Sequence, residues 1–402
     1  MPHGHRIINR LVDMIQLRYL KYGFDHVSTP LIFKKELWEK SGHWKNYKED
    51  MFAVTDAAAL KNCNYSHNHK DPDSGLKPMN CPGHCLMFAS QLHSYKDLPI
   101  RYAEFSPLHR NEASARQFHQ DDGHIFCTLD QVQNEILSSF KFVHEVYTIF
   151  GFPKYELNLS TRPKENYIGN IDEWDKAEAA LCKALDDNGH PWKINEGDGA
   201  FYGPQIDVHV QDALGRNHQT ATVQLDFQLP LRFSLKYLEE SGRHGMPVMI
   251  HRAVLGSIER MLAVLTEHWA RKWPFWCNPR QAIVTPIGAS NPEIISYVQK
   301  VAKYLKSPLS NPIAAFSENA ETSAYLPSTA DRFYVDLDLS TQSLNRSIRA
   351  SQLNRYSFSL VADEKEMSTN TLSVRQRDGK QLGSMSVSEV ANMFINMQKN
   401  YQ

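Results

Sequence analysis

Hydrophobic residues recur along the first part of the chain with the periods of helices and strands. The i, i+3, i+4, i+7 spacing of one helical face is met near the start by Ile8, Leu11, Val12, Ile15 and Tyr19. This spacing predicts an amphipathic helix, and Gly23 follows where a glycine commonly ends one. A short extended run at residues 25–30 closes with Pro30, which favours the edge or the end of a strand.

Short apolar and alternating runs continue through the middle of the chain. They predict strands at residues 100–105, 205–211, 220–225 and 247–250. The last strand leads into a helix with apolar residues at the helical period as far as Leu265. The stretch at residues 62–76 is polar and rich in turn residues, so we expect an exposed loop there. This part of the chain is therefore predicted to be α+β.

After a Trp- and Pro-containing junction at residues 273–279, strand and helix patterns alternate. The pattern predicts strands at residues 281–287, 332–339, 357–362 and 372–376, and helices at residues 292–305, at residues 344–354 and from Val387. Ser386 and Glu389 have the spacing of a capping box for the last helix. Such alternation predicts a small α/β domain with a largely parallel sheet. We therefore divide the chain into domains at residues 1–277 and 278–402.

Composition and charge narrow the class of protein. A chain of 402 residues with 42% hydrophobic content suggests two or three folded domains. With 44 Lys and Arg against 45 Asp and Glu, the chain is not a strongly basic protein that covers nucleic acid non-specifically. Local basic patches can still bind nucleic acid. No apolar run approaches the ~20 residues that span a bilayer, so no membrane partner is expected.

The cysteines and the N-terminus give further expectations. Six cysteines are too sparse for a disulfide framework, which predicts free thiols in a reducing compartment. The first ten residues resemble neither a signal peptide nor a transit peptide, so we expect a mature or trimmed chain.

Polar and charged residues are densest at residues 108–127. Arg110 and Glu112 alternate on one predicted strand, and a second strand has a face formed by Phe118, Gln120, Asp122 and His124. Two antiparallel strands of this kind would line a cleft for an anionic, aromatic ligand such as a nucleotide, because Arg can bind a phosphate and Phe can stack on a base. Composition alone slightly favours the alternative, a charged surface hairpin.

Several Cys and His residues are candidate metal ligands. Two clusters are close in sequence: Cys81 with His84 and Cys85, and Cys63 with His67 and His69. Neither has the paired spacing typical of a zinc site. A distributed set of Cys81, His124 and His251 is chemically sound and leaves one position open, but spacing alone makes it one combination among many. The alternative is that His251 is a hydrogen-bonded histidine at a strand end.

Two glycine-containing segments are weaker signals. Gly256 lies at a predicted strand-to-helix turn and Arg260 follows one helical turn later, an arrangement that can bind the end of a polyphosphate. Arg260 on a solvated helix face is the alternative. Residues 196–204 are rich in glycine but lack the spacing of a phosphate-binding loop. Either Tyr202 points into a site there, or the segment is a tight turn.

The order of several sequence blocks resembles the threonyl-tRNA synthetases, which are class II aminoacyl-tRNA synthetases. These blocks are TPLI, LWEKSGHW, KPMNCPGH, HRNEA, QDDGHIFC, EGDGAFYGP, TVQLDF and MIHRAVLGSIER. The resemblance implies a class II antiparallel sheet with flanking helices, followed from about Asn278 by a smaller α/β anticodon-binding domain. The surroundings of Pro30 look like motif 1, which implies a homodimer. PLHRNEA and QDDGHIF look closer to fungal mitochondrial members, which implies the mitochondrial matrix, with the cytoplasm as the alternative.

The resemblance also implies a role for particular residues. One Zn²⁺ per chain would be held by Cys81, His124 and His251. Threonine would be bound by Gln120, Asp122, Tyr202 and Gln224. ATP, with Mg²⁺, would be bound by Arg110, Glu112, Phe118, Gln219 and Arg260. Arg110 and Arg260 would also be catalytic through the phosphates, and His43 matches a residue proposed as a proton relay in the transfer to tRNA.

The implied activity is the ATP-dependent activation of L-threonine and its transfer to the 3′ end of tRNA(Thr). The alternative is a non-catalytic synthetase-like protein that binds tRNA or serves a polymerase, but such relatives typically lose motif arginines or metal ligands. This chain departs from the family pattern at Ser114, within a short motif 2 loop, and at Gln205, where many members have lysine. No segment resembles the N-terminal editing region, so we expect measurable activation of serine.

Overall fold

The computed structural model describes residues 1–55, 73–112, 116–152, 154–165, 167–212, 214–288, 290–308 and 332–402. These form two compact units, a larger one of residues 15–265 and a smaller one that combines residues 1–14 with residues 266–402. Most of the expected loop at residues 62–76, with Cys63, and the motif 2 loop at Ser114 lie outside the described residues. The predicted domain boundary at residues 277 and 278 stays a prediction.

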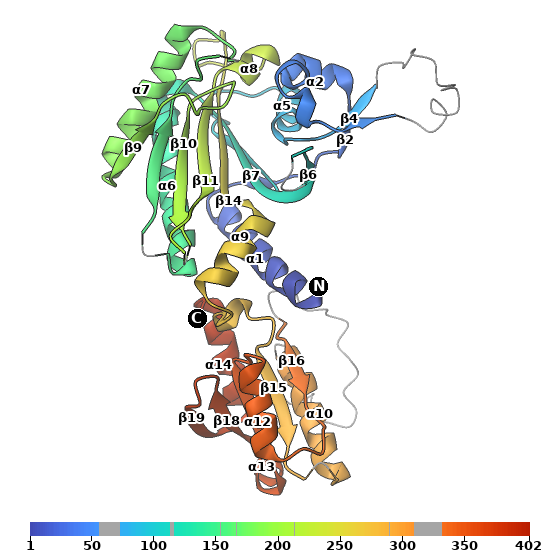
Figure 1. The fold of residues 1–402 in the computed structure, drawn as a ribbon. Coiled ribbons are helices and arrows are strands. Elements are labelled where there is room, and N and C mark those ends of the chain that lie inside the picture. The colour runs from blue at the N-terminus through green and yellow to red at the C-terminus, as the bar shows by residue number, and fades with distance from the viewer. Residues whose placement is uncertain are drawn as a thin grey trace. The chain divides into compact units, whose positions relative to one another are not determined.

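The larger unit is built on a nine-stranded sheet (Figure 1). Its order is β1 (Asp25–His26), β5 (Ile100–Glu104), β7 (Gln117–Cys127), β14 (Val248–Ser257), β11 (Asn217–Asp226), β10 (Gln205–Gln211), β8 (Glu156–Ser160) and β9 (Trp192–Asn195), with β6 (Pro107–His109) paired to β7. The outer pairs β1–β5 and β8–β9 are parallel and all the others are antiparallel. The predicted α+β class with a large antiparallel sheet is confirmed.

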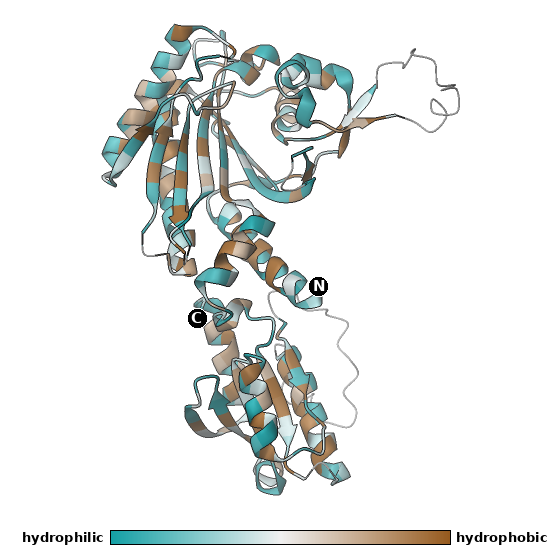
Figure 2. Cartoon of the chain, viewed as in Figure 1, coloured by the Kyte–Doolittle hydropathy of each residue, from teal (hydrophilic) through white to brown (hydrophobic). Residues whose placement is uncertain are grey.

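Helices pack on both sides of this sheet. α6 (Val132–Phe150) packs against β14 and β11, and α7 (Ile171–Asn188) packs against α6 and β11. α2 (Lys35–Ser41), α5 (Cys81–Ala89) and α8 (Gln228–Arg232) pack together, with α8 also against β14. A three-stranded sheet of β2 (Ile32–Lys34), β4 (Ser74–Leu76) and β3 (Ala53–Val54) adjoins α2. β10, with the sequence QIDVHVQ, alternates teal and brown in Figure 2, as expected for a strand with one apolar face.

The register of the central strands brings distant polar residues into one row. His124 on β7 is paired with His251 on β14, and Gln224 on β11 is paired with the same His251. Directly paired residues on neighbouring strands point to the same face. The next residue, Arg252, points to the opposite face, where its guanidinium carbon lies 4.1 Å from the centroid of the Phe142 ring of α6. One face of the sheet is therefore covered by α6, and the other presents the His124–His251–Gln224 row.

Some predicted element bounds are wrong. The strand expected at residues 247–250 is the ten-residue β14, and the one expected at residues 25–30 is only the two-residue β1. The loop expected to reach residue 76 ends instead in β4. Arg110 and Glu112 are not on a strand, because β6 ends at His109 and both residues follow it.

The smaller unit has a five-stranded sheet in the order β16 (Val335–Leu337), β15 (Ala282–Pro286), β17 (Phe358–Ala362), β18 (Thr371–Gln376) and β19 (Gln381–Ser386). The first three strands are parallel, but β18 and β19 are antiparallel additions, so the expectation of a largely parallel sheet is wrong. Its core includes α10 (Pro292–Lys306) and α14 (Val387–Lys399). The predicted capping box of α14 is confirmed, with reciprocal Ser386 and Glu389 bonds.

The remaining elements are short or shared between units. They are α1 (Pro2–Lys21), α3 (His43–Asn46), β12 (Tyr237–Leu238), β13 (His244–Gly245), α9 (Ile258–His268), α12 (Leu344–Leu353) and α13 (Glu364–Thr369). In the smaller unit, the beginning of α1 is bound through Arg6, which donates to the carbonyl of Pro279 at 2.9 Å. The five cysteines among the described residues are free thiols. No helix in the described ranges is long and apolar enough to span a bilayer.

Candidate active site

A cavity of about 720 Å³ opens on the face of the large sheet that presents the His124–His251–Gln224 row. Side chains from β7, β11, β14, α5 and α9 and from the glycine-rich segment at Tyr202 form its wall. The structure brings together the following candidate residues on this wall: Cys81, Arg110, Glu112, Phe118, Gln120, Asp122, His124, Tyr202, Gln219, Gln224, His251 and Arg260. His43 is not on the wall. A volume of this size suits a small-molecule ligand.

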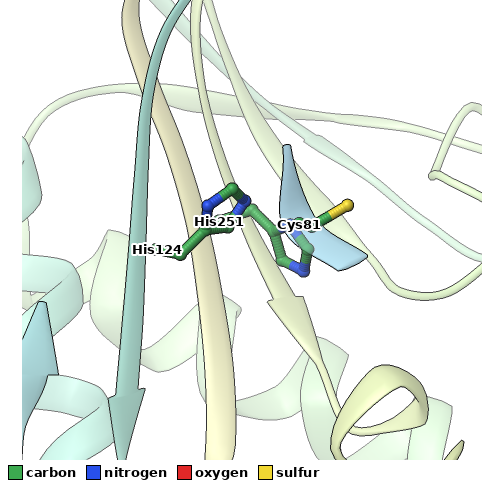
Figure 3. Close-up of side chains that lie close together, drawn as sticks. All are labelled: Cys81, His124 and His251. Atoms are coloured by element: carbon green, nitrogen blue, oxygen red, sulfur yellow. The ribbon is translucent and has the colours of Figure 1, made fainter. Parts of the chain in front are cut away.

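Three potential metal ligands meet at one end of the cavity. One ligand atom each from Cys81, His124 and His251 lies within 4.8 Å of the other two, and all three residues are buried (Figure 3). Cys81 comes from the first turn of α5, and the two histidines are the paired residues of β7 and β14. No other such group of three or more ligands occurs among the described residues.

The donor chemistry of this group fits zinc. Zn²⁺ favours thiolate and imidazole ligands, and three protein ligands leave a fourth position open. One ring nitrogen of each histidine is already occupied: His251 Nε2 lies 2.9 Å from Asp226 Oδ2, and His124 Nδ1 lies 2.7 Å from His84 Nδ1. Each ring therefore keeps one nitrogen for a metal. Burial, with the neighbouring His84, holds the pKa of His124 well below its usual value, which suits a neutral ligand.

The amide and carboxyl groups beside the metal ligands are held in fixed orientations. Asp122 accepts from the side chains of Asn80 at 2.8 Å and Gln120 at 2.6 Å, and its burial raises its pKa. Beside His251, whose ring centroid lies 5.1 Å from that of Tyr202, the Tyr202 hydroxyl donates to Gln224 Oε1 at 2.6 Å. These groups can orient a small ligand that has amino and hydroxyl groups.

The other end of the cavity has side chains of the kinds that can bind a nucleoside triphosphate. The Arg110 guanidinium carbon lies 5.0 Å from the centroid of the Phe118 ring, and its Nε donates to the carbonyl of Pro78 at 3.1 Å. Glu112 accepts a hydrogen bond from the Tyr47 hydroxyl at 3.0 Å. Arg260 reaches the cavity from the first turn of α9. Two arginines, an aromatic ring and a carboxylate can bind phosphates and a base.

Gly256 allows β14 to pass close to β11 just before Arg260. Its φ is +60°, and a Cβ there would lie 2.8 Å from the carbonyl oxygen of Thr220 and 3.3 Å from the Arg260 guanidinium. Only glycine adopts this backbone conformation at little cost. The close passage of β14 past β11 therefore depends on Gly256, and it leaves Arg260 room beside the strand.

The structure also adds residues that the sequence patterns missed. The cavity wall includes Tyr47, Met79, Phe201 and Glu259. Glu259 binds His119 on β7, with its Oε1 2.7 Å from Nδ1. Tyr47 follows the SGHW block, and Met79 lies within KPMNCPGH. Their position in or beside family-like sequence blocks was the signal that could have identified them as residues of the site. Their orientation depends on tertiary packing that no sequence period shows.

Two family profiles match the chain. The tRNA synthetase class II core domain (G, H, P, S and T) matches residues 64–269, and the anticodon binding domain matches residues 281–397. With the antiparallel sheet and its cavity, they define a class II tRNA synthetase core followed by an anticodon-binding domain.

Similar proteins show which family of this class the chain belongs to. The "probable threonine–tRNA ligase, mitochondrial" of Schizosaccharomyces pombe is 44% identical over 100% of this chain and 85% of its own length. The mitochondrial threonine–tRNA ligase of Saccharomyces cerevisiae is 42% identical over 100% of this chain and 87% of its own. The chain belongs to the threonine–tRNA ligase family. A solved structure described as the RNA binding domain of threonyl-tRNA synthetase from Cryptosporidium parvum is 41% identical, with a TM-score of 0.85 over 99% of this chain and 92% of that one.

Proposed function

We propose that this chain activates L-threonine with ATP and transfers the threonyl group to the 3′ end of tRNA(Thr). The observation that carries the proposal is the cavity itself, in which Cys81, His124 and His251 lie at one end and Arg110 and Arg260 contribute to the same wall. Family membership supports the same reaction. The alternative, a non-catalytic relative, is disfavoured because both arginines and all three metal ligands are present and face one cavity.

Zinc would be held by Cys81, His124 and His251 in the proposed enzyme. The bound ion would supply a Lewis acid for recognition of the amino and hydroxyl groups of threonine. Asp122, Gln120, Tyr202 and Gln224 then orient the amino acid around it. Valine lacks the hydroxyl and would be rejected, because a polar site left unpaired costs far more than an unfilled apolar pocket. Serine retains a hydroxyl and is expected to be activated measurably.

Adenylate formation would depend on positioning and charge rather than on a protein nucleophile. The threonine carboxylate would attack the α-phosphorus, the bond between the α-phosphorus and the bridging oxygen would break, and pyrophosphate would leave. Arg110 and Arg260 would offset the negative charge of the phosphate oxygens, together with the Mg²⁺ that ATP carries. Phe118 stacks on adenine, Glu112 accepts from its amino group, and Gln219 contacts the ribose. The Arg110 side chain is already oriented by Pro78, so little rotamer freedom is lost when phosphate binds.

His43 is the proposed proton relay for the second step, the transfer to tRNA. It is fully buried behind Met79 and Phe201, with Nε2 3.2 Å from Met79 Sδ and its ring centroid 5.6 Å from that of Phe201. Burial, aided by His251 and Arg110, lowers the pKa of His43 to about 3, so the ring is neutral but a weak base. A relay through His43 would therefore have to pass one proton on as it accepts another. Because it lies one layer behind the wall, a relay through His43 requires Met79 or Phe201 to move.

The remaining partners follow from family membership and from the sequence blocks. We propose binding of tRNA(Thr) through the anticodon-binding domain at residues 281–397 and a homodimer formed through motif 1 around Pro30. The mitochondrial matrix is the proposed location, with the cytoplasm as the alternative, and subcellular fractionation distinguishes the two. Sedimentation equilibrium at micromolar protein tests the dimer.

Amino acid-dependent ATP–pyrophosphate exchange tests the function most directly. The proposal expects exchange with threonine, weaker exchange with serine and none with valine above background. Elemental analysis of the same preparation should give one zinc per chain. Exchange with proline or histidine but not threonine would refute the substrate. Exchange with no amino acid, in a folded, zinc-loaded protein, would favour the non-catalytic alternative.

A further inference from the structure

A chain of buried polar side chains extends from the back of His124 away from the cavity. His124 Nδ1 lies 2.7 Å from His84 Nδ1, and His84 Nε2 lies 3.0 Å from Glu104 Oε2. Glu104 in turn forms an ion pair with Lys77 at 2.6 Å. All four side chains are almost completely buried, but only His124 is on the cavity wall. None of the other three can therefore touch a ligand in the cavity.

The partners of Glu104 determine which group donates and which accepts in this series of buried side chains. Its Oε1 accepts from Lys77 Nζ and from the backbone N–H of Thr29, and its Oε2 accepts from the Thr29 hydroxyl at 2.9 Å. Glu104 is thus surrounded by donors and acts only as an acceptor. His84 donates from Nε2, and with its proton on that nitrogen its Nδ1 keeps a lone pair and acts as the acceptor.

The same rule extends from His84 to the metal ligand. Because His84 Nδ1 accepts, His124 must carry its proton on Nδ1 and donate it, which leaves the lone pair of Nε2 free. His251 shows the direct version of this arrangement, since its Nε2 faces Asp226, which accepts from the backbone N–H of Gln228 and Leu229. The two histidines would thus use different nitrogens, Nε2 of His124 and Nδ1 of His251.

Such a buried ion pair is costly to maintain for stability alone. Replacement of a buried pair by well-packed apolar residues is often neutral or stabilising, so stability alone does not account for the Lys77–Glu104 pair. Groups that hold the second nitrogen of a metal-binding histidine fix its tautomer and strengthen the ligand. The Lys77–Glu104 pair, acting through His84, has the geometry for that role.

We propose that His84, held by Glu104, is the positioning residue that sets the tautomer of His124 so that Nε2 faces the metal. This inference rests on the zinc site of the proposed function. It assigns His84 and Glu104 to metal affinity rather than to contact with threonine or ATP. Loss of the acceptor at His84 would allow His124 to move its proton to Nε2, where it would compete with the metal.

Zinc affinity of three variants, measured by competition with a chromophoric chelator, tests the proposal. His84→Leu removes the acceptor, whereas His84→Asn offers an amide oxygen near the position of Nδ1. His93→Leu is the matched control, because His93 is also buried but binds the carbonyl of Phe88. The expected affinity loss is about 10- to 100-fold in His84→Leu. His84→Asn should recover most of the affinity, and His93→Leu should match the parent.

A second measurement needs no variant. Nitrogen-15 NMR of the histidine-labelled, zinc-loaded parent should show His124 protonated at Nδ1 and metal-bound at Nε2. A His124 bound through Nδ1 overturns the inference, and so does a folded His84→Leu variant with parental affinity. If either occurs while the parent binds one zinc, only this inference fails. A folded parent that binds no zinc overturns the inference and the zinc part of the proposed function together.

Discussion

Burial determines the charge of single residues around the cavity. His124 and His43 both lose water on folding, so the pKa of each ring falls and each stays neutral. Cys81 is buried too, which holds the pKa of its thiol well above the usual value. A thiol in this setting ionises only beside a strong cation, so Cys81 is suited to a metal and not to a reactive nucleophile. Burial therefore favours metal binding by Cys81 over a role as a covalent nucleophile.

The stability of the larger unit should depend on pH through His43. The unfolded residue has a pKa of 6.5 and the folded one a pKa of about 3, so the unfolded state binds the proton first as the pH falls. Stability contributed by neutral His43 is complete above pH 6.5 and is lost toward pH 3. Between pH 7.5 and 5.5 the loss from this residue is about 1.4 kcal/mol.

His43→Gln isolates that contribution. Urea unfolding of zinc-free protein should show a smaller loss of stability between pH 7.5 and 5.5 in the variant than in the parent, by about 1.4 kcal/mol. The zinc-free form is used so that acid release of the metal does not contribute. An equal loss in both proteins would mean that folded His43 titrates normally.

Arg260 provides a second test at the residue scale. Arg260→Ala removes one cation from the proposed phosphate end of the cavity, and loss of one such transition-state contact commonly lowers kcat by about 10²- to 10³-fold. Threonine-dependent ATP–pyrophosphate exchange measures the effect. Arg243→Ala is the control, because Arg243 is an exposed arginine of the same unit and is not on the wall. Equal exchange by both variants would remove Arg260 from the site.

The residues of the candidate site could be predicted from the sequence to different degrees. The period-two face of Phe118, Gln120, Asp122 and His124 was visible without the structure, because a strand presents alternate residues to one side. The set of Cys81, His124 and His251 was one combination among many, since it depends on the pairing of β7 with β14, more than a hundred residues apart. Only the family resemblance singled it out.

Elements were easiest to predict where burial follows a simple period. β10 and α14 begin where expected, because their apolar residues recur at the right spacing. β14 was predicted too short because His251 and Arg252 interrupt the apolar run. Arg252 is nevertheless buried, with its guanidinium over the rings of Tyr19, Phe24 and Phe142 at 4.8, 4.4 and 4.1 Å. Cation–π contacts from other elements are invisible in local sequence.

The approach of the glycine-rich segment to β11 gives a prediction at the element scale. A Cβ on Gly203 would collide with the backbone carbonyl of Leu225, and a backbone atom cannot rotate away. Gly203→Ala should therefore displace the segment that holds Tyr202. We expect a stability loss of about 1–3 kcal/mol and a raised KM for threonine in the exchange assay.

Gly4→Ala is the control for that substitution. Gly4 lies in α1, and a Cβ there meets nothing within 4 Å, so the change should be neutral or stabilise by up to about 1 kcal/mol. Gly203→Ala with parental stability and KM would show that the segment does not depend on close packing against β11.

For the whole molecule, the two units divide the proposed work between ATP chemistry and tRNA recognition. A net charge of −1 provides little general attraction for tRNA, so binding depends on localised Lys and Arg. In the smaller unit the parallel strand order β16-β15-β17 places α10 and α12 on opposite faces of the sheet, if both crossovers are right-handed as usual. Both helices carry exposed basic residues, Lys300 and Lys303 on α10 and Arg346 and Arg349 on α12.

Exposed arginines on α12 offer the last test. Arg346 and Arg349 are three residues apart on this helix and both are exposed. We expect α12 to face tRNA, so Arg346→Ala with Arg349→Ala should lower kcat/KM for tRNA about 5- to 30-fold. The slope of the logarithm of the binding constant against the logarithm of the salt concentration should become shallower by about one to two. Threonine-dependent exchange should not change, because it needs no tRNA. The matched control is Lys300→Ala with Lys303→Ala, an exposed pair at the same spacing on α10. A larger tRNA defect in the α10 pair would assign the recognition surface to the opposite face of the sheet.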